Sequence, residues 1–153
     1  MFDSCLFSNC KAQNGGAIYL KAGSAVTLSV TKGQFDSCKA TSYRGGGIYA
    51  EGIKTVIIEE SLFHTCVAAA TNNYGGGGIQ LWNIHQPFTV ESSMFISCQS
   101  GNDGGAICLS NTPSWQSPCL FHSFYIQCKA TSPTASGGGA MLLWDCNAVV
   151  GCF

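Results

Sequence analysis

Five glycine tracts, recurring at a period of about thirty residues, constrain this chain more than any other feature. The tracts are Gly15–Ile18, Gly45–Ile48, Gly76–Ile79, Gly104–Ile107 and Gly138–Met141. Each one follows an aromatic-x-x-Cys element, and these elements are Phe7/Cys10, Phe35/Cys38, Phe63/Cys66, Phe95/Cys98 and Tyr125/Cys128. Successive aromatics lie 28, 28, 32 and 30 residues apart. A fixed period of this size indicates stacked structural repeats.

Short strands are expected on both sides of each glycine tract. Apolar residues alternate before the aromatic, as in Leu28/Val30 and Val56/Ile58, and again after the glycines, as in Ile48/Ala50. Such alternation is typical of a half-buried strand, and no long window carries helical periodicity. We count three short strands per repeat. They lie before the aromatic, around the cysteine and around the glycine tract.

The predicted fold class is therefore all-β, a right-handed parallel β-helix of about five rungs. A single rung cannot bury its own apolar face, so stability comes from stacking. Leucine-rich repeats need an asparagine-leucine pattern that is absent, and a β-propeller blade needs roughly 40 residues or more. Residues 1–153 are expected to form one repeat array, which we interpret as a segment of a longer solenoid.

The repeat position of the cysteines argues against a disulfide framework for half of the ten. Five of them share one position, so they should form a column of small buried thiols. Neighbours in an in-register stack lie about 4.8 Å apart, whereas a disulfide needs Cβ atoms at about 3.8 Å. The remaining candidates for pairing are Cys108, Cys119, Cys146 and Cys152, and the sequence leaves their state open.

Charge and hydropathy exclude several classes of function. Charged residues make up only 10% of the chain, and the formal net charge is −1. Seven Lys and Arg residues cannot neutralise many phosphates, so nucleic acid is not an expected partner. No apolar stretch approaches the ~18 residues that cross a bilayer, and residues 1–5 lack the pattern of a signal peptide. We expect no membrane span within this chain.

The repeats resemble those of the chlamydial polymorphic membrane proteins. That family pairs Gly-Gly-Ala-Ile with Phe-x-x-Asn, and here Phe7-Ser8-Asn9-Cys10 precedes Gly15-Gly16-Ala17-Ile18. The asparagine of the family is replaced by cysteine in all five repeats, so a polar ladder becomes a thiol ladder. The family's signal peptide and C-terminal membrane barrel are not in this sequence. The resemblance implies a β-helix at the cell surface or outside the cell, used in adhesion.

Two columns of polar residues deserve a test as catalytic sites. Glu59 and Glu91 should lie on adjacent rungs, close enough to act as an acid/base pair or to share a cation. The simpler interpretation is a pair of solvated carboxylates with Lys54 or Lys32 nearby. Arg44 is the only arginine, whereas an enzyme acting on acidic sugars would usually present several cations.

The second column reads Ser8, Asp36 and His64. A catalytic triad needs histidine between serine and aspartate, because the histidine takes the serine proton. Here aspartate is in the middle, so we interpret Asp36 and His64 as a surface pair. The histidines have no ligands at metal-binding spacing, and the glycine tracts lack the Lys-Ser/Thr of a phosphate loop. We expect no catalytic residues, no metal and no cofactor.

Aromatic side chains beside the glycine tracts are the candidate binding residues. They are Tyr19, Tyr49, Trp82 and Trp144, all expected on the outer face of one sheet. Exposed aromatics can stack on sugar rings or anchor a protein. The alternative is that loops such as Asn111–Ser117 fold over them. The leading hypothesis is a non-enzymatic surface module for adhesion or display, with a protein or glycan ligand. The alternatives are a subunit that self-associates end to end into a filament, and a carbohydrate-active enzyme using Glu59 and Glu91.

Overall fold

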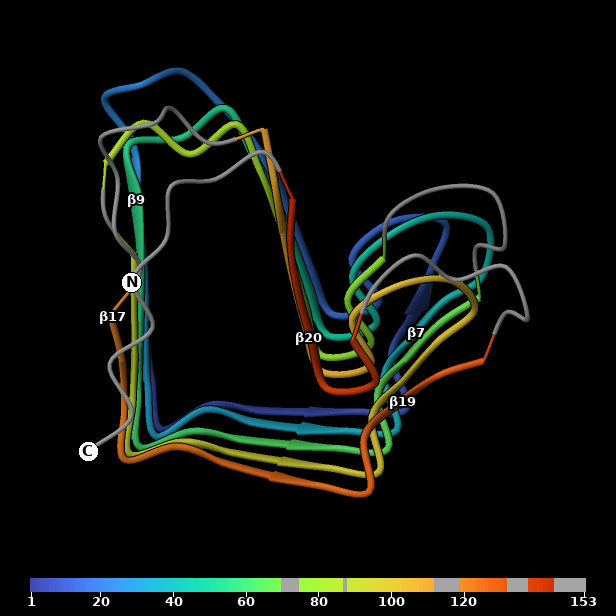
Figure 1. The fold of residues 1–153 in the computed structure, drawn as a ribbon. Helices are drawn as coiled ribbons and strands as arrows, with labels where there is room; N and C mark the ends of the chain where they lie inside the picture. The colour runs from blue at the N-terminus through green and yellow to red at the C-terminus, as the bar shows by residue number, and fades with distance from the viewer. Residues whose placement is uncertain (70–74, 87, 112–118, 132–137, 145–153) are drawn as a thin grey trace.

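The computed structural model is a parallel β-helix, consistent with the right-handed form predicted from the repeats. It describes residues 1–69, 75–86, 88–111, 119–131 and 138–144. Every described strand pairs in parallel with the equivalent strand of a neighbouring rung. No described residue is helical. Viewed along the axis, the successive turns lie one behind another (Figure 1).

Each turn contributes a strand to four sheets, one more than the three strands per rung that we counted from the sequence. Sheet A holds β1 (Phe2–Asp3), β5 (Thr27–Thr31), β9 (Thr55–Glu59), β13 (Thr89–Glu91) and β17 (Cys119–Phe121). Sheet B holds β2 (Leu6–Ser8), β6 (Gln34–Asp36), β10 (Leu62–His64), β14 (Met94–Ile96) and β18 (Phe124–Ile126). Sheet C holds β3 (Lys11–Ala12), β7 (Lys39–Ala40), β11 (Val67–Ala68), β15 (Gln99–Ser100) and β19 (Lys129–Ala130). Sheet D holds β4 (Ile18–Lys21), β8 (Ile48–Glu51), β12 (Ile79–Trp82), β16 (Ile107–Ser110) and β20 (Met141–Trp144).

Two sharp corners separate sheets A, B and C, and each is made by one left-handed residue. The corner from A to B uses Ser4, Lys32, Glu60, Ser92 and His122, with φ between 48° and 53°. The corner from B to C uses Asn9, Ser37, Thr65, Ser97 and Gln127, with φ of 53° or 54°. This conformation costs about 1–2 kcal/mol for a residue with a side chain. The second corner lies one residue before each cysteine. It divides the single strand expected around the cysteine into one strand of sheet B and one strand of sheet C.

In most rungs, the residue that follows a left-handed corner is a serine or a cysteine that binds the backbone of the preceding rung. At the first corner, Ser61 Oγ accepts a hydrogen bond from the Gly33 amide at 3.0 Å and donates to Glu59 O at 2.7 Å. Ser93 Oγ likewise accepts from the Ser61 amide at 3.1 Å. These serines supply partners to backbone groups that the bend removes from the sheet ladder.

Cysteine has the same role at the second corner. The Cys66 thiol donates to Phe35 O of the preceding rung at 3.4 Å, and Cys98 donates to Phe63 O at 3.4 Å. All five column cysteines are free, and Cys38, Cys66 and Cys98 are buried. The predicted thiol column is thus confirmed, with the sulfurs bonded to carbonyls rather than to each other. The neighbouring thiols of Cys38 and Cys98, together with burial, raise the pKa of the Cys66 thiol.

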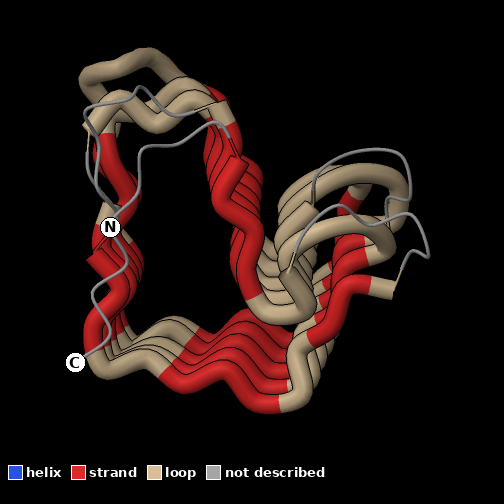
Figure 2. The backbone as a smooth tube through the Cα atoms, in the orientation of Figure 1, coloured by secondary structure: helices blue, strands red, loops and turns tan. Residues whose placement is uncertain are grey.

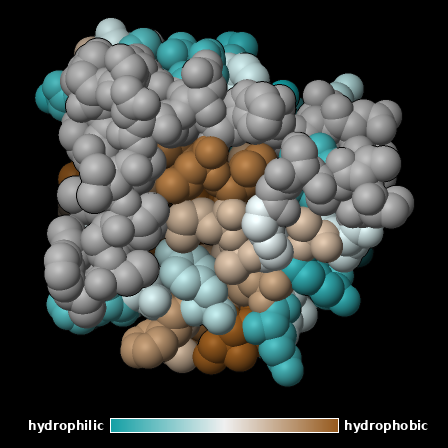
Figure 3. All heavy atoms as spheres, in the orientation of Figure 1, coloured by the Kyte–Doolittle hydropathy of each residue, from teal (hydrophilic) through white to brown (hydrophobic). Residues whose placement is uncertain are grey.

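A stack of aromatic rings runs through the core beside the thiols. Phe35 and Phe63 have centroids 4.5 Å apart and ring planes within 2°, and Phe63 and Phe95 follow at 4.7 Å and 4°. Phe7 and Tyr125 extend the stack at its two ends. Apolar side chains gather inside the outline of the turn (Figure 3). This interior is the hydrophobic core that stacking creates.

The second glycine of each of the first four tracts lies where two backbones nearly touch. A Cβ atom on Gly46 would collide with Gly77 O and Val67 N, both backbone atoms that cannot move aside. We expect Gly46→Ala to destabilise the fold by about 3 kcal/mol, at the upper end of the usual cost of overpacking. Urea unfolding followed by circular dichroism measures this.

Gly23→Ala is the matched control, because a Cβ there would meet nothing within 4 Å. Its free energy of unfolding should stay within about 1 kcal/mol of the wild type. Equal effects of the two substitutions would contradict the close approach at Gly46.

Burial predicts the order in which the column thiols react. In the native protein, Cys38, Cys66 and Cys98 should resist iodoacetamide, whereas half-buried Cys10 should be alkylated. Unfolding in urea should make all four reactive, as peptide mapping by mass spectrometry would reveal. Disulfide-linked peptides containing Cys66 or Cys98 in the oxidised native protein would contradict the thiol-to-carbonyl ladder.

Candidate functional site

Loops that lead from sheet C to sheet D form a second lobe, which covers part of the outer face of sheet D. After sheet C the chain runs away from the core and turns back toward sheet D (Figure 2). Outward-facing Tyr49, Gln80 and Cys108 form one column of sheet D, yet all three are buried. They are absent from the main core cluster, so they belong to a separate buried layer between sheet D and this lobe. Burial raises the pKa of Cys108 to about 11.

Four aromatics were proposed as an exposed binding row, and the structure describes three of these side chains, of which Tyr19 alone is classed as exposed. Tyr19 is 49% exposed, whereas Tyr49 is only 4% exposed and Trp82 is half-buried. Tyr19 and Tyr49 do stack, with ring centroids 5.3 Å apart and planes within 4°. The side chain of Trp144 lies outside the described residues. Exposure of Tyr49 was therefore a wrong prediction, because the returning loop covers it.

Arg44, in that returning loop, connects the buried and exposed aromatics. Its guanidinium carbon lies 4.4 Å from the centroid of the Trp82 ring, within cation–π range. Arg44 Nη1 donates to Tyr49 Oη at 3.4 Å. The Arg44 amide donates to Asn14 Oδ1 of the preceding loop at 3.5 Å. These contacts hold the arginine across three successive rungs.

Glu51 is the last residue of β8, the strand that also carries Tyr49. Its carboxylate accepts hydrogen bonds from two neighbours. Lys21 Nζ donates to one carboxylate oxygen at 2.7 Å, and Tyr49 Oη donates to the other at 2.7 Å. The hydrogen bond from Lys21, and then that from Tyr49, hold the pKa of Glu51 below its usual value despite partial burial. Burial, and then the hydrogen bond to Glu51, raises the pKa of Tyr49. Glu51 is therefore anionic and Tyr49 neutral at physiological pH.

These side chains surround an open hollow of about 260 Å³. Its lining residues are Asn14, Tyr19, Tyr43, Arg44, Tyr49 and Glu51. Tyr43 is 46% exposed and adds a second accessible ring to the lining. Sequence reasoning missed Asn14, Tyr43 and Arg44, because they lie outside the repeating columns. One signal in the sequence could have identified them. They lie just before the glycine tracts, in loops whose length differs from repeat to repeat.

The two acidic side chains considered for catalysis are adjacent, as predicted. Glu59 and Glu91 are register partners on β9 and β13, and with Glu60 and Ser92 they line a hollow of about 270 Å³. Lys32 approaches Glu60 at 4.0 Å rather than either of the pair. Within the described ranges, no group of three or more metal-ligating side chains is arranged to hold an ion.

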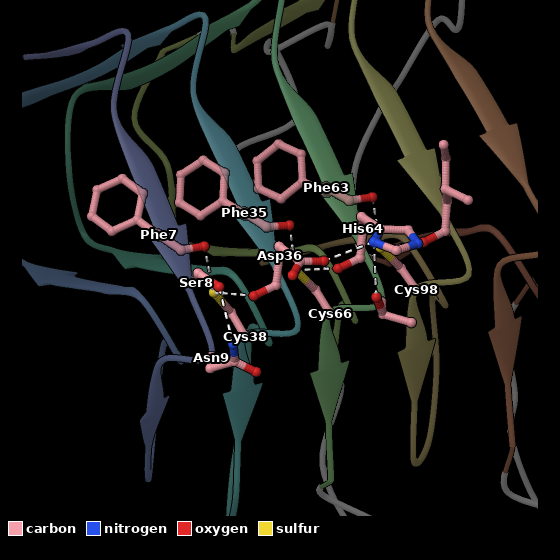
Figure 4. Close-up of polar contacts among 12 residues, drawn as sticks. Phe7, Ser8, Asn9, Phe35, Asp36, Cys38, Phe63, His64, Cys66 and Cys98 are labelled. Carbon is pink, nitrogen blue, oxygen red and sulfur yellow. Dashed lines mark hydrogen bonds and ion pairs between the residues drawn. The ribbon is translucent and has the colours of Figure 1, made fainter.

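Asp36 and His64 form the expected surface pair. His64 Nδ1 lies 2.7 Å from Asp36 Oδ1, and both side chains are largely exposed (Figure 4). Thr65 Oγ1 lies 3.1 Å from the same histidine nitrogen. Ser8 is the register partner of Asp36 on the far side from His64, so the order Ser-Asp-His is confirmed. This order does not allow histidine to take a proton from serine.

A second surface, where β14 and β18 form part of the outer face of sheet B, is apolar. Its exposed side chains are Met94, Phe124 and Ile126, and Leu6 is exposed on β2 of the same sheet. In β14 and β18 these side chains flank the inward Phe95 and Tyr125, so both strands are apolar on both faces. The missing polar alternation in Met94-Phe95-Ile96 and Phe124-Tyr125-Ile126 was the sequence signal for this surface.

Comparisons with protein-family models, with curated protein sequences and with solved structures find no match to this chain.

The contacts of Glu51 predict a pH dependence of stability. A carboxyl whose pKa is lowered by folding contributes stability above its unfolded pKa, and this contribution is lost as pH falls through the folded value. Glu51→Gln should therefore lower the melting temperature at pH 7. The difference from the wild type should shrink steadily below about pH 4.5.

Thermal melts across this pH range measure the effect. Glu60→Gln is the control, because Glu60 has only a long contact to an exposed lysine. Its melting temperature should track the wild type at every pH. A constant difference for Glu51→Gln from pH 7 to pH 3 would contradict the assigned interactions.

Proposed function

We propose that this chain is a non-enzymatic β-helix module at the cell surface or outside the cell, which binds a glycan for adhesion or display. The observation that carries the proposal is the hollow beside sheet D. Exposed rings of Tyr19 and Tyr43 border it together with polar groups of Asn14, Arg44 and Glu51. Aromatic faces that stack on sugar rings, with a few fixed polar groups, are the usual composition of such sites.

The arrangement of the other polar groups favours binding over catalysis. The Asp36–His64 pair lacks a serine in line, and Glu59 and Glu91 lie on an outer sheet face without a cation beside them in the described part of the chain. None of the described segments is a helix long and apolar enough to cross a bilayer. A place in a polymorphic membrane protein-like family is part of the proposal, supported by the repeat motif. End-to-end assembly stays a prediction from the sequence.

Substitution of the exposed rings tests the site. A glycan array should identify ligands of the wild type, and Tyr43→Ala should weaken the best one about fivefold, since a stacked ring contributes about 1 kcal/mol. Tyr19→Ala should have a similar effect. Isothermal titration calorimetry with the array ligand measures both.

Phe124→Ala provides the control, because Phe124 is an exposed aromatic ring on sheet B, away from the hollow. Its affinity for the same ligand should equal that of the wild type. Absence of any glycan ligand, or equal loss in Phe124→Ala and Tyr43→Ala, would overturn the proposal.

A further inference from the structure

We infer that the hollow recognises a carboxylate-bearing sugar, and that the Arg44 guanidinium binds the carboxylate. This inference rests on the proposed glycan-binding function of the same hollow. It adds the chemical class of the ligand. It also gives a role to the single arginine of the chain, which the repeats leave unexplained.

The guanidinium of Arg44 is fixed in position yet has spare hydrogen-bonding capacity. Its contact with the Trp82 ring at 4.4 Å holds it in place, and the side chain is half-buried. A guanidinium carries five N–H donors, of which the described contacts engage one, to Tyr49 Oη at 3.4 Å. Partial burial of a cation costs free energy unless an acceptor binds its unused N–H donors.

In the described part of the chain, no carboxylate forms an ion pair with the Arg44 guanidinium. The described ion pairs of this chain are Lys21–Glu51, Lys32–Glu60 and His64–Asp36, and none includes Arg44. Glu51 is the one acidic group lining the hollow, and both of its oxygens are already engaged, by Lys21 and by Tyr49. The lining carries one cation, Arg44, and one anion, Glu51, and the carboxylate of Glu51 is paired with Lys21 beside the hollow at 2.7 Å. Among the described residues, Arg44 is thus the lining charge that has no ion-pair partner. The hollow therefore suits an anion.

The remaining lining favours a sugar as the carrier of that anion. Tyr19 and Tyr43 offer exposed ring faces to the apolar face of a pyranose. Asn14 can hydrogen-bond a sugar hydroxyl, and the planar fork of arginine matches a carboxylate with two parallel bonds. Uronic acids and sialic acids share this chemistry, a carboxylate attached to a pyranose.

Calorimetry with matched ligands tests the inference without any substitution. The probes are trigalacturonic acid against its carboxyl-reduced neutral form, and sialyllactose against lactose. The wild type should bind at least one acidic probe ten or more times more tightly than its neutral partner. Which acidic probe binds distinguishes a uronic acid from a sialic acid.

Two variants then identify the group responsible. Arg44→Gln should remove the preference for the acidic probe, and Arg44→Lys should recover only part of it, because lysine keeps the charge but loses the fork. Lys39→Gln removes one exposed cation on sheet C outside the hollow, and should behave as the wild type. Circular dichroism confirms that each variant is folded. If Arg44→Gln does not fold, Arg44→Lys and the ligand pairs still decide the matter.

The outcomes separate this inference from the proposed function. Equal binding of acidic and neutral probes overturns the acidic ligand while leaving a glycan-binding site. Acidic preference that persists in Arg44→Gln overturns the role of Arg44, and so does an equal loss in Lys39→Gln. If galactose 1-phosphate binds as tightly as the carboxylate-bearing probes, the assignment of a carboxylate ligand is overturned. Binding of no glycan at all overturns both the inference and the proposed function.

Discussion

The fold depends on a backbone conformation that most residues avoid. Ten residues with side chains adopt positive φ at the two corners that connect sheets A, B and C. Each costs energy, and each also removes backbone groups from the ladder. Where a serine or cysteine follows the corner, its side chain offsets this by bonding to the backbone of the preceding rung, as Ser61 does with Gly33 and Cys66 does with Phe35. The corner and the polar side chain that follows it therefore act together. Stacking of the rungs repeats these hydrogen bonds along the axis as a serine ladder and a thiol ladder.

This division of labour leaves the outer face of the turn free to vary. The aromatic stack, the thiol ladder and the second glycine of the first four tracts demand near-identical rungs. The loops between sheet C and the glycine tracts carry no such demand, and they supply Asn14, Tyr43 and Arg44 to the hollow. The proposed binding site thus lies where the repeat constrains the sequence least, which is the usual arrangement in proteins whose rigid scaffold positions variable loops.

Most of the fold was predictable from the sequence, because side chains alternate with period two and identical positions stack in register. The thiol column, the Glu59–Glu91 neighbours and the Asp36–His64 pair all follow from that register. The fourth sheet was not predictable, since the second corner uses residues as different as Ser37 and Thr65. The burial of Tyr49 depends on how a loop of non-repeating sequence returns to sheet D. Repetition identifies what is shared between rungs, whereas the site is made from what differs.

The hollow and its support draw on three rungs. The lining comes from the first two, as Tyr19 and Arg44 do, and Trp82 of the third packs against the arginine. The repeating unit of the fold is a single rung, whereas the proposed recognition site needs a set of three consecutive rungs. Removal of one whole repeat would let the core close again in register, since each rung presents the same columns. The same deletion within that set would erase the hollow. Gain or loss of repeats by recombination would thus remove or create a proposed recognition site of this kind while preserving the ability to fold.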